Sequence, residues 1–275
     1  MKEERFFYKY IVVSKAIGDF IAFESFLTDT EKINLKEVIY VSRNESTPHF
    51  ECIDKSKFYN KNCKKTIIKS TSDIENKKAL VNSYFDKNPE IERDKVLIDW
   101  NFYRNNNIEN KPIIENIKNY SFIKEKLCEI DKFKLPTEYV SISGWTYQRT
   151  KKRILEIKEW HEIIKTLKKY NIKGVIVNNQ TWYLENSWFV EILKNENCFI
   201  NLTGQTNFFE AIEIVKNSKY FIGIDSCLSI IATQSLPEES IMIKSNKGSG
   251  SYNLSNYFYS NLKTKKCLVK KIIEI

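Results

Sequence analysis

Histidine, glycine and proline are scarce in this sequence. Its 275 residues include 2 His, 7 Gly and 5 Pro. Few Gly and Pro residues argue against long flexible linkers. Because His49 and His161 are the only histidines and the 6 cysteines form no CxxC pair, a zinc site is not expected. We therefore expect no resident metal or cofactor, and cysteines that remain free, buried thiols.

A long hydrophobic run is also missing. No stretch approaches the roughly 18 consecutive apolar residues that a membrane-spanning helix requires. The N-terminal sequence MKEERFFYKYIVVSK has charges before an apolar run, but the run is too short for a signal peptide and lacks a small-residue cleavage site. We therefore expect a buried first strand and a cytoplasmic protein. The composition, 42% hydrophobic and 29% charged, is typical of soluble globular proteins.

Positive charge is in excess, with a formal net charge of +9. Three kinds of partner are consistent with this excess: nucleic acid, an anionic membrane surface and a phosphorylated small substrate. No RNA-reading or DNA-reading motif is present in the sequence, so nucleic acid has no support beyond the charge. The charge alone does not decide among the three.

Short β-rich apolar runs alternate with longer amphipathic stretches, a pattern typical of α/β proteins with parallel sheets. In the first half we expect strands at residues 10–14, 37–42, 66–69 and 95–100, a helix beginning near Asp19, and an exposed loop at 104–112. In the second half we expect strands at 139–143, 173–177, 198–202, 220–224, 240–244 and 267–272. The helices between them are expected at 159–170, 186–194, 207–217 and 226–235.

A domain boundary is expected at Pro136, which lies between a helical run and the next strand. We assign residues 1–135 to an N-terminal domain and residues 136–275 to a Rossmann-like C-terminal domain. The chain is long enough for two small domains, each with its own core.

The turn after the first predicted strand has the sequence Lys15-Ala16-Ile17-Gly18-Asp19. Ligands of open α/β sheets bind beyond the carboxyl ends of the strands, so this turn is a candidate site. Gly18 allows a tight turn of the backbone. From the spacing alone, the favoured explanation of Asp19 is an N-cap of the following helix.

A second strand-to-helix junction has the sequence Ile224-Asp225-Ser226-Cys227-Leu228-Ser229. Backbone N–H groups at a helix N-terminus, together with the helix dipole, are suited to a diphosphate. The hydroxyls of Ser226 and Ser229 are further donors. A capping motif with Asp225 or Ser226 at the N-cap explains the same residues equally well.

A basic loop follows the sequence Ser143-Gly144-Trp145-Thr146. Cations at the carboxyl end of a strand can neutralise phosphate. In a chain this rich in lysine, a solvated surface is the more common explanation. The basic residues of this loop, up to the next helix, are Arg149, Lys151, Lys152, Arg153 and Lys158.

Taken in their order along the chain, these segments resemble the ADP-heptose:lipopolysaccharide heptosyltransferases of glycosyltransferase family 9. The matching segments are the turn at 15–19, Ser143-Gly144-Trp145 followed by Lys158-Glu159-Trp160, NLTGQT at 201–206 followed by Phe209-Glu210, and DSCLS at 225–229 followed by Ala232. They cover the C-terminal half nearly end to end, and the N-terminal half only at the turn. The resemblance implies a GT-B fold, in which two Rossmann-like domains face each other across a cleft. It also implies that residues 1–135 bind the acceptor and residues 136–275 the nucleotide sugar.

The resemblance further implies residue roles. Asp19 would be the general base that deprotonates the acceptor hydroxyl, and Lys158 would pair with donor phosphate. Asn178-Asn179-Gln180 and Glu185 lie where contacts with the base and ribose would fall. The implied donor-binding residues are Gly18, Ser143, Thr146, Lys158, Asp225, Ser226, Cys227 and Leu228.

The function implied by the resemblance is that of an inverting glycosyltransferase that needs no bound metal, since helix N–H groups and Lys158 would stabilise the leaving diphosphate. It would move a heptose or similar sugar from a nucleotide-diphosphate donor, ADP-linked in the family, to a glycan, glycolipid or lipopolysaccharide-type acceptor. The basic charge is consistent with peripheral contact at the inner face of the membrane. Cys227 and Ile230 stand where the family usually has Gly and His. The alternative is therefore a catalytically degenerate sugar-nucleotide-binding protein of the same fold, and a nucleic-acid-associated protein has only the charge in its favour.

Overall fold

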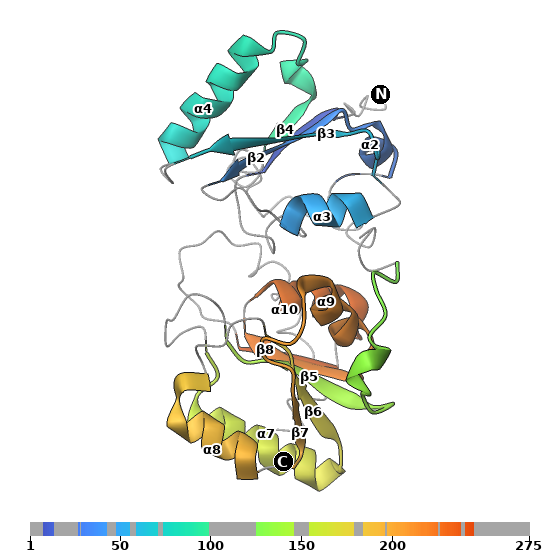
Figure 1. Ribbon diagram of the computed structural model, residues 1–275, viewed down its shortest axis with the longest axis vertical. Helices are drawn as coiled ribbons and strands as arrows, with labels where there is room; N and C mark the ends of the chain where they lie inside the picture. Colours follow the sequence, from blue (N-terminus) through green and yellow to red (C-terminus); the bar gives the residue numbers. More distant parts are fainter. Residues whose placement is uncertain are drawn as a thin grey trace, which may run out of the picture. The chain divides into compact units, whose positions relative to one another are not determined.

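The computed structural model describes residues 8–13, 27, 29–42, 48–55, 59–70, 74–98, 125–145, 154–178, 184–195, 197–224, 226–237 and 240–244. The chain divides into two compact units, Met1–Glu125 (unit 1) and Lys126–Ile275 (unit 2). Each unit contains its own parallel sheet (Figure 1). Residues 126–135 belong with unit 2, because the Leu127 N–H donates to Glu213 Oε1 at 2.9 Å and Lys132 pairs with Glu210 Oε1 at 2.6 Å.

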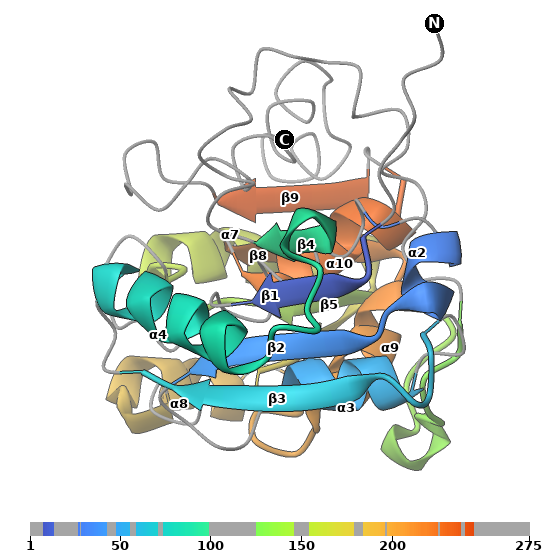
Figure 2. The same cartoon turned by 90° about the horizontal axis from the view of Figure 1, so that it is seen from above.

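Unit 1 has a four-stranded parallel sheet in the order β3-β2-β1-β4, which Figure 2 shows from above. Its strands are β1 (Tyr10–Val13), β2 (Glu37–Ser42), β3 (Lys64–Lys69) and β4 (Val96–Ile98). Helix α4 covers one face of the sheet and α3 lies on the other (Figure 1). The helices described in this unit are α2 (Asp29–Asn34), α3 (Pro48–Lys55), α4 (Ile74–Lys87) and the short 3-10 helix η1 (Arg93–Lys95).

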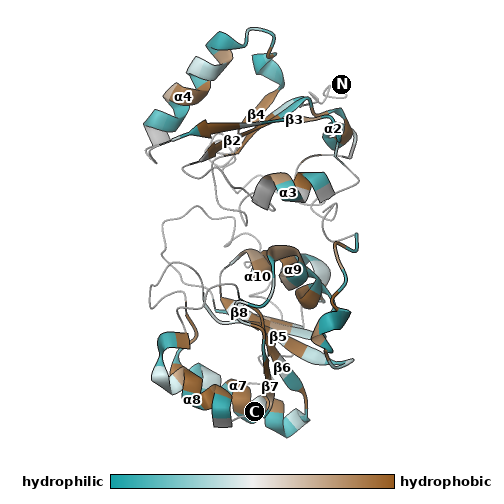
Figure 3. Ribbon diagram, viewed as in Figure 1, coloured by the Kyte–Doolittle hydropathy of each residue, from teal (hydrophilic) through white to brown (hydrophobic). Residues whose placement is uncertain are grey.

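The central strands of unit 1 are apolar on both faces, as expected for a parallel sheet covered by helices. Tyr10 and Val12 of β1 pack towards Val81 and Phe85 of α4. Between them along the strand, Ile11 is fully buried on the opposite face. In Figure 3, α4 alternates between hydrophilic and hydrophobic residues, because only one side of the helix meets the sheet.

Unit 2 has a five-stranded parallel sheet in the order β7-β6-β5-β8-β9. Its strands are β5 (Tyr139–Ser143), β6 (Lys173–Ile176), β7 (Phe199–Asn201), β8 (Tyr220–Ile224) and β9 (Ile241–Lys244). Helices α7 and α8 cover one face, and α9 and α10 cover the other (Figure 1). The described helices are the 3-10 helix η3 (Asp131–Phe133), α7 (Ile157–Tyr170), α8 (Ser187–Asn195), α9 (Phe208–Lys216) and α10 (Cys227–Ser235).

Three aromatic side chains form the centre of the core beneath α7 and α8. The ring centroids of Trp160 and Phe189 lie 4.9 Å apart, and those of Trp145 and Phe189 lie 5.4 Å apart. All three side chains are almost completely buried. Aromatic pairs at these separations add to the hydrophobic stabilisation, so they fix the start of α7 against the end of β5.

The predicted alternation of strands and helices is confirmed across the described part of unit 2. The strands predicted at 37–42, 139–143 and 220–224 have the predicted bounds, and the others begin or end within two residues of them. Helices α2, α3 and α4 were not predicted. The predictions for the helix near Asp19, the loop at 104–112 and the strand at 267–272 lie outside the described residues.

Candidate functional site

The order of the strands in unit 2 reverses at β5. From β5 the sheet continues to β6 and β7 on one side and to β8 and β9 on the other. Ligands of open parallel sheets bind at such a reversal, beyond the carboxyl ends of the strands. Ser143, at the end of β5, pairs with Gly223 of β8 in the ladder. The segments that follow the five strands therefore emerge at one edge of the sheet, which we call the carboxyl edge of unit 2.

Helix α10 begins at this carboxyl edge. Ser226 is its N-cap, and the Ser226 hydroxyl oxygen accepts a hydrogen bond from the Ser229 N–H at 3.4 Å. The Ser229 hydroxyl donates to the Ile224 carbonyl. Both hydroxyls therefore serve the start of the helix, as the capping interpretation expects. The first N–H groups of the helix, those of Cys227 and Leu228, have no acceptor within the helix and are available to an anion.

The thiol of Cys227 lies at the same helix start. Burial raises the pKa of this thiol to about 11, while the backbone N–H groups of Leu228 and of Cys227 itself act in the opposite direction. The sulfur is therefore close to the N–H groups that an anion would use. At neutral pH the thiol is protonated, so it is a poor nucleophile.

The end of β5 packs closely against α7. A Cβ atom on Gly144 would lie 2.7 Å from Cζ2 of Trp160, so this close approach requires glycine. The Leu155 N–H donates to the Gly144 carbonyl at 2.7 Å. Ser143, directly before Gly144, is only 2% exposed. The start of α7 is thus fixed at the carboxyl edge.

Four charged side chains gather at the start of α7. Lys158, whose side chain is 79% exposed, lies 3.5 Å from Glu156 Oε2. The Glu156 N–H donates to Glu159 Oε2 at 2.6 Å, which closes the helix cap. Lys244, at the end of β9, donates to the same Glu159 oxygen at 2.8 Å. Lys244, and to a lesser extent Lys158, hold the pKa of the Glu156 carboxyl below its ordinary value.

Asn178, which follows β6, forms hydrogen bonds with the segments that follow β5 and β7. Its side-chain amide donates to the Trp145 carbonyl at 2.7 Å, and its own carbonyl accepts from the Gly204 N–H at 2.7 Å. The residue is buried, with 6% exposure. Asn178 therefore has a positioning role in this structure, whereas Glu185, also named for base and ribose contacts, is exposed.

The described site residues all lie at the carboxyl edge of unit 2, as the sequence predicted. They are Ser143 at the end of β5, Lys158 in the first turn of α7, and Ser226, Cys227 and Leu228 at the start of α10. Their roles in donor binding stay predictions. Six further residues predicted for the site lie outside the described residues: Gly18, Asp19, Thr146, Asn179, Gln180 and Asp225.

Sequence analysis did not identify Lys244 or Glu156 as parts of the site, and it named Asn178 for base and ribose contacts rather than for a positioning role. The available signal for Lys244 was a lysine ending the apolar strand sequence IMIK. Glu156 and Lys244 are distant in the sequence and meet only because β9 lies beside β8.

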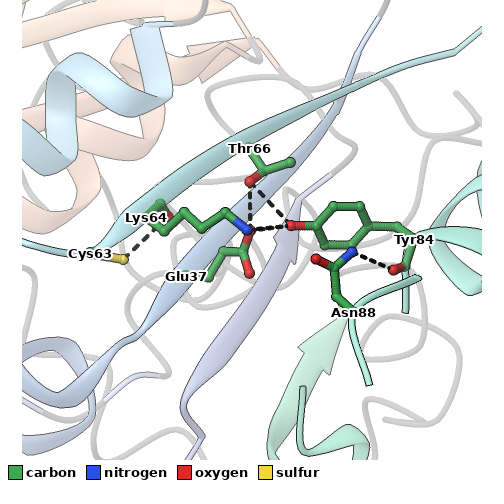
Figure 4. Close-up of polar contacts among 6 residues, drawn as sticks. All are labelled: Glu37, Cys63, Lys64, Thr66, Tyr84 and Asn88. Carbon is green, nitrogen blue, oxygen red and sulfur yellow. Dashed lines mark hydrogen bonds and ion pairs between the residues drawn. The ribbon is translucent and has the colours of Figure 1, made fainter. Parts of the chain in front are cut away.

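Unit 1 has a polar cluster at the amino ends of β2 and β3 (Figure 4). The Glu37 carboxylate is buried, with its side chain 4% exposed. Its Oε1 accepts hydrogen bonds from the Thr66 hydroxyl at 2.5 Å and the Tyr84 hydroxyl at 2.6 Å, and lies 3.1 Å from Lys64 Nζ. Because ligands of such sheets bind at the opposite ends of the strands, we interpret this cluster as structural.

No group of three His, Cys, Asp or Glu side chains among the described residues could hold a metal ion. None of the helices described is long and apolar enough to cross a membrane.

Comparisons with protein-family models and with curated proteins gave no match. Among solved structures, the chain is similar to a family 9 glycosyl transferase from Veillonella parvula, with a TM-score of 0.53 and 13% identity over 97% of this chain and 96% of that one. It is also similar to the E. coli heptosyltransferase WaaC with ADP-2-deoxy-2-fluoro heptose, with a TM-score of 0.51 and 12% identity over 92% of this chain and 98% of that one. At such low identities the likeness concerns the fold. The predicted fold class is thereby confirmed: the chain has the α/β fold with two parallel sheets that these GT-B glycosyltransferases share.

Proposed function

We propose that this chain is an inverting, metal-independent glycosyltransferase that moves a sugar from a nucleotide-diphosphate donor to a glycan or lipopolysaccharide-type acceptor. The observation that carries the proposal is the reversal of strand order at β5, which brings the end of β5 and the start of α10 to one edge of a parallel sheet. The fold shared with family 9 glycosyltransferases supports the reaction class. The similar structure of WaaC is a structure with ADP-2-deoxy-2-fluoro heptose, which supports an ADP-linked heptose, or a similar sugar, as the donor.

In this proposal the donor diphosphate binds at the start of α10. The N–H groups of Cys227 and Leu228, together with the positive end of the helix dipole, hold its oxygens. Lys158 neutralises the charge that develops as the bond between the anomeric carbon and the diphosphate oxygen breaks. Asp19 accepts the proton of the acceptor hydroxyl, whose oxygen attacks the anomeric carbon from the opposite side and inverts it.

A thermal-shift screen with ADP, UDP, GDP and CDP tests the donor site. A ligand that binds only the folded protein stabilises it by about 2.7 kcal/mol at 100 times its Kd, which raises the melting temperature. We expect one diphosphate to give a clear shift, and its nucleoside, which lacks phosphate, to give a much smaller one. If no diphosphate raises the melting temperature of the folded protein, the proposal of a donor site at the start of α10 is refuted.

Substitution of Asp19 tests the general base. Asp19→Asn removes the proton acceptor at nearly constant size, so we expect transfer to be abolished while the diphosphate still shifts the melting temperature. That retained shift is the internal control for folding and donor binding. An active Asn variant would contradict the assignment of Asp19.

The second candidate is a sugar-nucleotide-binding protein of the same fold without catalysis. It is favoured by the Cys227 thiol beside the N–H donors and by Ile230, a buried apolar residue in the same helix. This candidate would be supported if the protein binds a nucleotide sugar but neither transfers the sugar nor hydrolyses the nucleotide sugar, even slowly. Turnover of any nucleotide sugar would rule it out.

The cytoplasmic location and the peripheral membrane contact stay predictions from the charge and the N-terminal sequence.

A further inference from the structure

Glu156 lies between two lysines at the carboxyl edge of unit 2. Its Oε2 is 3.5 Å from Lys158 Nζ on α7, and its Oε1 is 3.7 Å from Lys244 Nζ at the end of β9. Each carboxylate oxygen thus faces a different ammonium group. The Glu156 side chain is 47% exposed, so the bridge lies at the surface and is open to solutes.

Lys244 is held in place by further contacts. Its ammonium group donates to Glu159 Oε2 at 2.8 Å and to the Ile154 carbonyl at 3.1 Å, and its side chain is only 22% exposed. Its Cα is paired with that of Ile224 in the ladder between β8 and β9. Because Ile224 is two residues before Ser226, Lys244 is anchored beside the strand that leads into α10.

The distances separate one strong ion pair, Lys244 with Glu159, from two weaker ones, those of Glu156 with Lys158 and Lys244. The contact of Lys244 with Glu159, at 2.8 Å, is typical of a charge-assisted hydrogen bond, whereas both contacts of the Glu156 carboxylate with a lysine are longer than such bonds. The Glu156 side chain also accepts from the Glu159 N–H in the capping box of α7, a contact that the carboxylate gives up when it moves aside. Ion pairs between exposed groups contribute little, because water and salt screen them. An arriving dianion can therefore displace Glu156 without disturbing the anchor of Lys244.

We propose that Glu156 is a built-in competitor of the donor diphosphate, and that Lys158 and Lys244 bind the diphosphate once the Glu156 carboxylate has moved aside. Glu156 occupies the position of an anion next to two cations and the positive end of the α7 dipole. By neutralising the two lysines in the ligand-free protein, it lowers the affinity of the site and favours release of the diphosphate product. This inference rests on the proposed function, because it adds Glu156 and Lys244 to the same donor site.

Titration calorimetry with inorganic pyrophosphate tests the competitor. Glu156→Gln removes the charge at constant shape, and we expect it to tighten pyrophosphate binding about threefold to tenfold, the range of one or two exposed ion pairs. Glu162→Gln is the matched control: Glu162 is exposed on the same helix, and the variant has the same net charge. Its long-range effect is screened by salt, so we expect less than about a twofold change at 0.15 M salt. Equal affinities in the two variants, weaker binding by Glu156→Gln, or no binding by any of these proteins would each overturn the inference.

Variants of the two lysines test the cation pair. We expect Lys158→Met and Lys244→Met each to weaken pyrophosphate binding, and Lys165→Met, an exposed position about two turns further along α7, to leave it unchanged. Lys158 is the safer variant, since its exposed side chain contributes little to folding. Unchanged affinity in Lys158→Met would overturn the inference. If pyrophosphate behaves as expected but no nucleoside diphosphate binds, the proposed function fails while the anion site stands.

Discussion

Removal of the Tyr84 hydroxyl is a direct test of the polar cluster in unit 1. The hydroxyl donates to Glu37 Oε1 at 2.6 Å, and the carboxylate is almost completely buried (Figure 4). A hydrogen bond to a charged group contributes about 1.5–3 kcal/mol, so Tyr84→Phe should lower the free energy of unfolding of unit 1 by that amount. Lys64 cannot compensate, because its side chain is 57% exposed and such pairs contribute only about 0.2–1 kcal/mol.

Hydrogen exchange of peptides from β2 and β3 is the suitable assay, because it reports on the opening of unit 1 separately from unit 2. A loss of about 1.5–3 kcal/mol corresponds to exchange that is about 10-fold to 150-fold faster. Tyr170→Phe is the control, since Tyr170 is 47% exposed on α7 and its hydroxyl should be worth less than about 0.5 kcal/mol. The reasoning is refuted if β2 and β3 exchange at the same rate in both variants.

Three further predictions concern buried groups. Burial raises the pKa of the Cys63 thiol from 9.0 to about 11, so between these values the folded chain keeps a proton that the unfolded chain loses. The free energy of unfolding should therefore fall as the pH rises from 9 to 11. Urea unfolding at several pH values should show a smaller fall for Cys63→Ala. Cys227→Gly removes the sulfur beside the α10 N–H groups and should tighten nucleoside diphosphate binding severalfold in calorimetry; unchanged or weaker binding would contradict this. Gly144→Ala places a Cβ 2.7 Å from Trp160 and should destabilise unit 2 by about 1–3 kcal/mol in urea unfolding, whereas an unaffected midpoint would show that Trp160 moves freely.

The strands of both units were readable from the sequence because their residues repeat a local pattern. The runs EVIYVS, YVSIS and YFIGI are rich in β-branched and aromatic residues, and all three form strands with the predicted bounds. Helix α4 was missed because it has a weak signal: of its described side chains, only Val81 and Phe85 are buried, among many lysines and asparagines. Helix α3 begins with Pro48, a start signal that was overlooked.

The candidate site was only partly readable. The segments at Ser143 and Ser226–Leu228 were identified because each lies at or just beyond the end of a predicted strand, and the carboxyl ends of parallel strands form one edge. The use of the Ser226 and Ser229 hydroxyls for capping could be named only as one of two alternatives, since hydrogen-bond partners depend on the actual backbone geometry at the helix start.

By itself, the sequence determined the alternation of strands and helices, because periodicity and propensity are local properties of the chain. It also determined the residue types present at each strand end. Only the tertiary structure decided that β9 lies beside β8, so that Lys244 reaches Glu156 and Glu159 of α7. It likewise decided that Glu37, Lys64 and Tyr84 share one polar cluster around a buried carboxylate. Such contacts depend on strand order, register and the packing of distant segments, which no local pattern specifies.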